Sequence, residues 1–355
     1  MRWKQFAFCT LVALCTTGQL AVAQGPTSGS MFQNWVANRI QFSLVGGRIA
    51  CSNKNGSWMF GIPRQVMTNG LIREQISLNG NGMTTGSVVY GYQERTKADQ
   101  PNDLKVDFTL DLNSEGRFIM RYADKEQAEK CFELTQLPGQ PVSLSVPGAG
   151  KPRVLRAPSI WHLLIINDED CGKQFAPLLE AVRNDWHVAH TAKVAEDELV
   201  KMSAVSQKAD RKQWEAWVNQ LADPQYIKRD QADHHLRDVG PAVLGYLNRL
   251  NMNQLDTEQR SRLRRITRDL AAQNGEDTPE HVASMLSEDP LVWLALLARP
   301  EEPTRQAAAQ QLTALLNMPI AVDPKADPAS QVKARAALRT RIEKTVGADD
   351  GNSKR

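Results

Sequence analysis

Residues 104–113 read Leu-Lys-Val-Asp-Phe-Thr-Leu-Asp-Leu-Asn, an unbroken alternation of apolar and polar side chains. Successive side chains of a β-strand point to opposite faces, so this run predicts a strand with one face on a core and the other in water. Residues 113–116 read Asn-Ser-Glu-Gly and supply a turn, after which the alternation resumes at Phe118, Met120 and Tyr122. Together these residues predict a β-hairpin.

The period of two extends outward from this hairpin over residues 35–157. Ile40, Phe42 and Leu44 predict an earlier strand. It ends at Gly46-Gly47, a pair suited to a tight turn because glycine accepts a positive φ. Short antiparallel strands joined by glycine turns are typical of a sandwich or an open barrel. We therefore expect residues 35–157 to form an antiparallel β domain of one of these two kinds.

After Pro158 the apolar spacing changes to that of helices. Ser159 is placed to cap a first helix. The helix that follows contains Pro177, which is expected to kink it or to shift its start. These features predict a helical hairpin over residues 158–205 that connects the β domain to the rest of the chain.

Residues 206–346 predict an array of amphipathic helices, so the fold class is α+β. One helix has an expected capping box, because Asp256 is followed three residues later by Gln259. Two triplets share one spacing and lie 76 residues apart (305 − 229): Arg229, Ala232, Leu236 and Arg305, Ala308, Leu312. An offset of two units of 38 indicates HEAT-like repeats built from helix pairs.

The N-terminus has the three parts of a cleavable signal peptide over residues 1–23. Arg2 and Lys4 precede an apolar run at 6–14, and Ala21-Val22-Ala23 ends the segment. The run is far shorter than the ~20 residues that span a bilayer. We expect a periplasmic or extracellular protein without a transmembrane anchor after cleavage, with a linker at 24–34 and a disordered tail at 347–355.

Charge and cysteine content limit the partners and the redox chemistry. Arg2 and Lys4 account for two of the 43 basic residues, which leaves 41 against 40 acidic ones, a net charge of +1 after signal removal. A protein that relies on phosphate contacts needs a large basic excess, so a nucleic-acid partner is not expected. Cys51, Cys131 and Cys171 remain after cleavage, and either one disulfide with a spare thiol or three unpaired thiols is compatible with export.

The connector and the helices also resemble a known group of sequences. The similar residues are Ser159-Ile160-Trp161-His162-Leu163-Leu164, Cys171, Ala176-Pro177-Leu178-Leu179-Glu180 and Asp185-Trp186, then Arg229-Asp230-Gln231-Ala232 and Asp289-Pro290-Leu291-Val292-Trp293-Leu294. They resemble segments of a family of uncharacterised exported bacterial proteins, in which a small β domain precedes HEAT-like helical repeats. The resemblance implies a protein that mediates interactions, and it transfers no catalytic residue to this chain.

No nucleophile, base and oxyanion donor come together in the sequence pattern, so neither catalytic residues nor a cofactor or metal is predicted. The alternative is a zinc site at His187 and His190, which would share a face of a helix, with Asp185 or Glu196 as a third ligand. The competing interpretation is an ordinary helix edge.

The surface with the clearest charge pattern follows Asp256. Arg260, Arg264 and Arg268 recur every four residues and so share one face of the predicted helix. The leading hypothesis is an exported, non-catalytic scaffold whose helical repeats present a surface to another protein. These arginines are the candidate contacts for an acidic partner, whereas the simpler interpretation is a solvated surface. A second hypothesis is carbohydrate or envelope-polymer binding by the β domain, with Tyr90 and Tyr92 as stacking residues. The oligomeric state stays open.

Overall fold

The computed structural model describes most of the chain. The predicted signal peptide, the linker and the tail beyond residue 347 lie outside the described residues. The described residues are 36, 38–54, 62–69, 71–80, 86–96, 104–126, 131–148, 151–167, 171–183, 185–205, 211–248, 250, 252–272 and 275–347.

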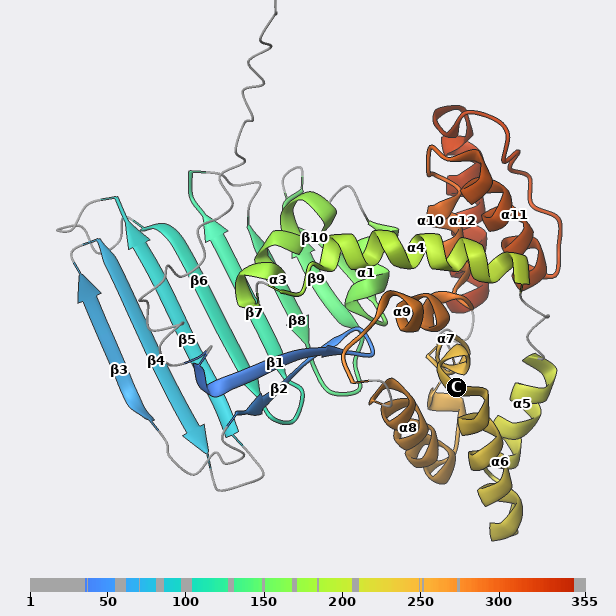
Figure 1. The fold of residues 1–355 in the computed structure, drawn as a ribbon, viewed down its shortest axis with the longest axis horizontal. Helices are drawn as coiled ribbons and strands as arrows, with labels where there is room; N and C mark the ends of the chain where they lie inside the picture. Colours follow the sequence, from blue (N-terminus) through green and yellow to red (C-terminus); the bar gives the residue numbers. More distant parts are fainter. Residues whose placement is uncertain are drawn as a thin grey trace, which may run out of the picture.

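An eight-stranded antiparallel sheet forms the N-terminal half (Figure 1). Each strand pairs with its neighbour in the chain, in the order β10-β9-β8-β7-β6-β5-β4-β3. The strands are β3 (Ile62–Asn69), β4 (Ile72–Gly80), β5 (Gly86–Arg95), β6 (Leu104–Asn113), β7 (Phe118–Asp124), β8 (Phe132–Gln136), β9 (Val142–Val146) and β10 (Arg153–Ala157). Among the described strands β3 and β10 remain edges. The expected sandwich or open barrel is therefore replaced by one large open sheet with a small second sheet against it.

The alternating run that predicted the hairpin forms strands β6 and β7. Phe108, Leu110 and Leu112 are buried, and they pair in register with Tyr122, Met120 and Phe118 of β7. The Asn113 side chain accepts the backbone N–H groups of Glu115 and Arg117, which closes the predicted turn. This part of the sequence prediction is confirmed.

A two-stranded hairpin, β1 (Ile40–Val45) and β2 (Arg48–Asn53), lies across one face of the large sheet (Figure 1). Its turn is the predicted Gly46-Gly47 pair, with φ of 59° and 68°. Gln136 of β8 is buried and fixes the hairpin to the sheet, because its side chain accepts from Ile49 N and donates to Ile49 O.

The predicted connector contains α1 (Ile160–Ile166), the π-helical turn η3 (Cys171–Phe175), α3 (Ala176–Val182) and α4 (Val188–Val205). Ser159 caps α1 as predicted, with its hydroxyl accepting His162 N. Pro177 stands in the first turn of α3, so its effect is on the start of the helix. Helix α4 packs against α9 and α11, and the connector therefore shares the core of the helices that follow.

The C-terminal half is helical. Its helices are α5 (Arg211–Gln220), α6 (Tyr226–Val239), η4 (Gly240–Val243), α7 (Leu244–Leu247), η5 (Met252–Gln254), α8 (Thr257–Ala272), α9 (Pro279–Leu286), α10 (Pro290–Leu296), α11 (Glu302–Leu316), η6 (Pro328–Gln331) and α12 (Val332–Gly347). The predicted capping box of α8 is present, since Gln259 N donates to Asp256 Oδ1 (2.7 Å) and Asp256 N donates to Gln259 Oε1 (3.0 Å). Within the described residues, no helix combines the length and apolar composition that crossing a membrane requires.

Helices α6 and α11 begin with the same arginine contact. Arg229 Nη1 donates to the carbonyl oxygens of the residues six and five positions before it, at 2.8 and 3.0 Å. Arg305 Nη1 donates to the two carbonyl oxygens at the same positions before α11. Leu236 and Leu312, which share the 76-residue offset of the two arginines, are both fully buried. The two triplets noticed in the sequence therefore occupy matching positions in their helices.

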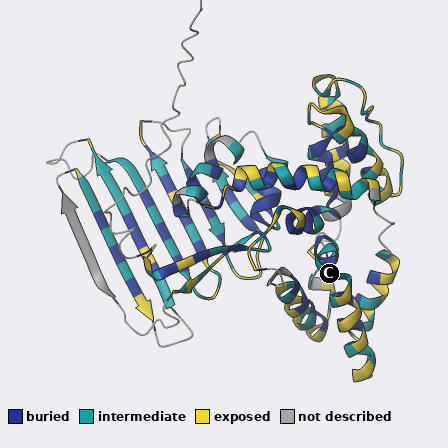
Figure 2. Ribbon diagram, viewed as in Figure 1, coloured by how far each residue is buried: buried dark blue, intermediate teal, exposed yellow. Residues whose placement is uncertain are grey.

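The two halves are joined through the turn of the β1–β2 hairpin. Gly46 N and Gly47 N donate to the Asp277 carboxylate at 2.7 and 2.6 Å, and Trp161 Nε1 donates to it at 2.6 Å. In return Asp277 N donates to Leu44 O at 2.9 Å. Buried side chains of both halves form one contiguous cluster, which passes from the sheet through α1 into the helices (Figure 2).

Candidate functional site

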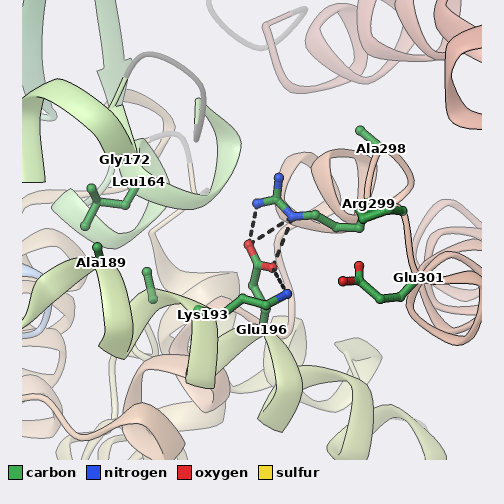
Figure 3. A pocket seen from close by; sticks show the side chains of 10 residues that line it. Leu164, Gly172, Ala189, Lys193, Glu196, Ala298, Arg299 and Glu301 are labelled. Carbon is green, nitrogen blue, oxygen red and sulfur yellow. Dashed lines mark hydrogen bonds and ion pairs between the residues drawn. The ribbon is translucent and has the colours of Figure 1, made fainter. Parts of the chain in front are cut away.

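A pocket of about 290 Å³ lies between α1, α4 and the turn that joins α10 to α11 (Figure 3). Helix α4 contributes Lys193 and Glu196, and the turn contributes Arg299 and Glu301. The chain positions these charges by packing α4 against α11, which brings the Arg299 side chain over α4.

The charges of this pocket are largely used by the protein itself. Arg299 Nε donates to both carboxylate oxygens of Glu196, at 3.0 and 3.2 Å, and its Nη2 donates to the same carboxylate and to Ile165 O. Lys193 Nζ lies 3.5 Å from Glu196. A buried carboxylate needs such partners, because an isolated charge in a protein interior is strongly unfavourable. The pair therefore links α1, α4 and the α10–α11 turn, and serves the fold.

Ser159, His162 and Asp289 form a chain of contacts that resembles a hydrolase triad. Ser159 Oγ lies 2.7 Å from His162 Nδ1, and His162 Nε2 lies 3.4 Å from Asp289 Oδ2. Both outer groups also cap helices, since Ser159 Oγ accepts His162 N and Asp289 Oδ1 accepts Leu291 N. Ser159 is 2% exposed and Gly47 packs directly against it, so this hydroxyl is closed to a substrate. The cluster joins α1 to α10.

The two histidines of the proposed zinc site do not share a helix face. His187 has a φ of 43° and precedes α4, whereas His190 lies inside that helix. Both side chains are exposed.

The two suggested third ligands already have partners. Glu196 accepts hydrogen bonds from Arg299. Asp185 is hydrogen-bonded to Arg183, and this contact lowers the pKa of the Asp185 carboxyl. In the described part of the chain, no three His, Cys, Asp or Glu side chains are grouped closely enough to hold a metal ion.

The tyrosines suggested for polymer binding lie on the core face of the sheet. Tyr90 is fully buried and donates to Glu74 at 2.6 Å, and Tyr92 is half-buried against the same core. Burial raises the pKa of Tyr92 to about 12. Because Tyr90 is fully buried and Tyr92 packs against the same core, the two rings do not form the exposed pair that stacking on a polymer would need.

No disulfide joins Cys51, Cys131 and Cys171 in the described part of the chain. Cys171 is buried, and Cys51 and Cys131 are partly buried. Cys51 Sγ donates to Asn113 O at 3.1 Å, and burial raises its pKa to about 12. A thiol with so high a pKa is a weak nucleophile at neutral pH.

Arg260, Arg264 and Arg268 lie on α8, on the side opposite its core residues. Arg264 and Arg268 are exposed, and Arg260 is half-buried with Nη2 donating to Thr257 Oγ1 at 3.3 Å. The inner face consists of fully buried Leu263, Ile266 and Leu270. Among the described residues, no carboxylate forms an ion pair with any of these three arginines.

The neighbouring arginines of α8 are paired. Asp233 of α6 is 4% exposed and lies between three guanidinium groups. Arg265 Nη2 donates to it at 2.9 Å, Arg262 Nη1 lies 3.8 Å away, and Arg237 Nε donates to its other oxygen. This network fixes α8 to α6, and so sets the orientation of the unpaired arginines.

A second exposed feature lies beside these helices and was not predicted from the sequence. Tyr226 and Ile227, on the first turn of α6, are 60% and 70% exposed. The guanidinium groups of Arg229 and Arg262 lie 5.7 and 5.8 Å from the centre of the Tyr226 ring. The exposure of Ile227 could have been predicted from the sequence, because at 100° per residue Ile227 lies opposite the buried side of α6.

Comparison with known proteins adds no relative from which residue roles could be transferred. No protein-family model, no curated protein and no solved structure matches the chain. Function therefore has to be inferred from the geometry and charges of the chain itself.

Proposed function

We propose that the chain is an exported, non-catalytic interaction protein whose helical half binds an acidic partner protein through Arg260, Arg264 and Arg268. One observation carries this proposal. Arg264 and Arg268 are exposed and no carboxylate pairs with them in the described residues, whereas Arg262 and Arg265 on the same helix are both paired with Asp233. Asp233 neutralises the α8 arginines that face α6, whereas the arginines that face solvent have no ion pair among the described residues.

The three unpaired arginines favour a protein over a nucleic acid as partner. They form a local positive surface on a chain whose overall charge is close to neutral, which suits a patch of carboxylates better than an extended run of phosphates. Exposed charges are screened over about 8 Å at physiological ionic strength, so the interaction should be strongly salt-dependent.

HEAT-like repeats over residues 206–346 are part of the proposal. The matching arginine contacts of α6 and α11 support a common structural unit, and helix-pair arrays present extended faces to partners. Export and membership of the family that the sequence resembles rest on the residues quoted above. Intact mass of the secreted protein tests the export step. A mature start at Gln24, or within a residue or two of it, is expected, and retention of Met1 or an added lipid at Cys15 would contradict it.

The test of the interaction changes Arg260, Arg264 and Arg268 to Glu together. The fold should remain intact, because surface substitutions usually alter stability by only about 0.5 kcal/mol each. Binding to poly-L-glutamate at low salt, and recovery of partners from the envelope fraction, should both be lost. The matched control changes Lys333, Arg339 and Arg341 of α12 to Glu, which is the same change in charge at another helix. If the α8 variant binds like wild type, the α8 arginines are an ordinary solvated surface.

A further inference from the structure

The exposed pair Tyr226 and Ile227 is unusual for the position that it occupies. Large exposed apolar side chains occur singly on most proteins, but here two lie in sequence on one helical turn. Tyrosine and arginine are also the residues most enriched at the energetically dominant positions of protein interfaces.

Helix α11 provides an internal comparison for the first turn of α6. Helices α6 and α11 are related by 76 residues and share the arginine contact, so Tyr226 and Ile227 correspond to Glu302 and Pro303. Both residues of α11 are exposed. The first turn of this kind of helix therefore forms without a large aliphatic or aromatic side chain, and Ile227, which is 70% exposed, is not required by the core of the chain.

The Tyr226 ring is also held in place before any partner arrives. Two guanidinium groups lie within 6 Å of its centre, at the distance of cation–π contacts. Arg229 is fixed by its backbone contacts, and Arg262 donates to Glu258 at 2.6 Å. An aromatic side chain that is already ordered loses little conformational entropy on binding, which favours affinity.

Tyr226 lies beside one row of α8 arginines, Arg262, Arg265 and Arg268, which follow one another at three-residue steps along the helix. Arg262 contacts the Tyr226 ring, and Arg265, one turn further along α8, is tied to α6 through Asp233. Helix α8 packs beside α6 (Figure 1), and the exposed Arg268, one turn beyond Arg265, continues this row, whereas Arg264 lies about 200° round the helix from Arg262. The surface thus combines Tyr226 and Ile227 at the start of α6 with the positive charge of Arg268 on α8.

We infer that this composite surface binds an acidic segment of a partner protein that carries an aromatic or aliphatic side chain, and that this side chain packs on Tyr226 and Ile227. The inference rests on the proposed function, because the charge of α8 defines the acidic character of the segment. The apolar pair adds selectivity that charge alone does not give, since electrostatic attraction treats all acidic segments of similar charge alike.

The experiment compares two defined probes on the purified protein at low salt. Poly-L-glutamate carries only charge, and a random glutamate–tyrosine copolymer (four to one) adds aromatic side chains. Wild type should bind the copolymer about fivefold to tenfold more tightly, the size expected for one well-packed anchor. Tyr226→Ser with Ile227→Ser should remove this preference and leave poly-L-glutamate affinity within about twofold. The matched control, Val154→Ser with Val332→Ser, removes two other exposed apolar side chains and should retain the preference.

The outcomes separate this inference from the proposal beneath it. If the serine variant keeps its preference for the copolymer while the α8 arginine variant loses poly-L-glutamate binding, the composite surface is wrong and the basic surface stands. If the arginine variant still binds poly-L-glutamate, the proposed function itself fails. Equal or tighter binding of oligothymidylate would overturn the assignment of a protein partner. Circular dichroism of each variant confirms that it is folded.

Discussion

Gly47 is the residue at which the β1–β2 hairpin meets the helices. Its φ of 68° lies in the left-handed region, and a Cβ atom there would stand 2.4 Å from Ser159 Cβ and 2.9 Å from Trp161 Cδ1. Glycine thus serves two purposes at this position. It permits the two-residue turn, and it lets the turn approach α1 closely enough for Gly47 N to reach Asp277.

Gly47→Ala should destabilise the protein more than the same change at Gly116. Both residues have positive φ, but nothing lies within 4 Å of a Cβ atom at Gly116. Gly116→Ala should cost about 1 kcal/mol for the backbone conformation alone. Gly47→Ala should cost about 1–3 kcal/mol more, because Ser159 and Trp161 must move. Urea unfolding of both variants measures the difference, and equal costs would show that the contact with α1 is loose.

At the scale of elements, the joint between α6 and α8 depends on the ionisation of Asp233. Burial alone would raise the pKa of Asp233, but the hydrogen bonds from Arg237 and Arg265 outweigh it, and the pKa is lowered. The folded state therefore binds fewer protons at this carboxyl than the unfolded state does. The stability that it contributes is complete above the unfolded pKa, about 4, and is lost as the pH falls through the lower folded pKa.

Asp233→Asn tests this linkage through the pH dependence of unfolding. At neutral pH the variant should be about 2 kcal/mol less stable, the usual scale for hydrogen bonds to charged groups. Below about pH 4 the difference from wild type should shrink, since the wild-type carboxyl also becomes neutral there. Asp111→Asn, at an exposed pair with Arg117, is the control. A constant difference between pH 7 and pH 2 would contradict the assigned role of the charge.

The matching positions of Leu236 in α6 and Leu312 in α11 give a second prediction at the scale of helices, which concerns stability. Leu236→Ala and Leu312→Ala should each cost about 2–5 kcal/mol, because both side chains are fully buried and leave a cavity. Leu71→Ala is the control, since Leu71 is 45% exposed. Thermal unfolding of the three variants gives the comparison. If neither helical variant loses stability, the repeat register of the two triplets is wrong.

Local features of the fold could be predicted from the sequence, and distant contacts could not. The alternation at 104–113, the Gly46-Gly47 turn and the Asp256–Gln259 capping box each lie within a few residues of chain, where steric rules and hydrogen bonding act directly. The Asp277 contacts join residues 230 and 231 positions apart. Nothing in the immediate neighbourhood of Asp277 distinguishes it from a surface acid.

For the candidate sites too, local features could be predicted from the sequence, and contacts between distant residues could not. The four-residue spacing of Arg260, Arg264 and Arg268 by itself predicts that they share one face of a helix. Which arginines of α8 stay unpaired depends on Asp233, a residue of another helix. The open sheet, which replaced the expected sandwich or barrel, depends on pairing between strands whose order the alternation alone does not specify.

At the scale of the whole molecule, the β1–β2 hairpin connects the sheet to the helices at several points. Besides the Asp277 contacts, Arg183 Nη1 donates to Phe42 O at 2.7 Å and pairs with Glu276. Hydrogen bonds from the hairpin thus reach both the connector and the segment before α9. Because buried side chains also run continuously through both halves, we expect the chain to unfold as one unit.

Asp277→Ala should separate the two halves. The Asp277 side chain has no solvent exposure, and its removal leaves three N–H donors, of Gly46, Gly47 and Trp161, without their acceptor. Each unsatisfied group costs about 1–3 kcal/mol, a large share of the roughly 5–15 kcal/mol that stabilises a domain.

Hydrogen exchange in low urea measures the effect of Asp277→Ala segment by segment. In wild type the amides of β1, β7 and α11 should share one opening free energy. In the variant the β1–β2 amides should exchange at least about tenfold faster, the factor that corresponds to 1.4 kcal/mol, while α11 stays protected. Asp277→Asn, which retains one acceptor oxygen, should lie between the two. If β1 and α11 remain equally protected in Asp277→Ala, the shared hydrophobic core alone joins the halves, and the hairpin contacts with Asp277 contribute nothing to their coupling.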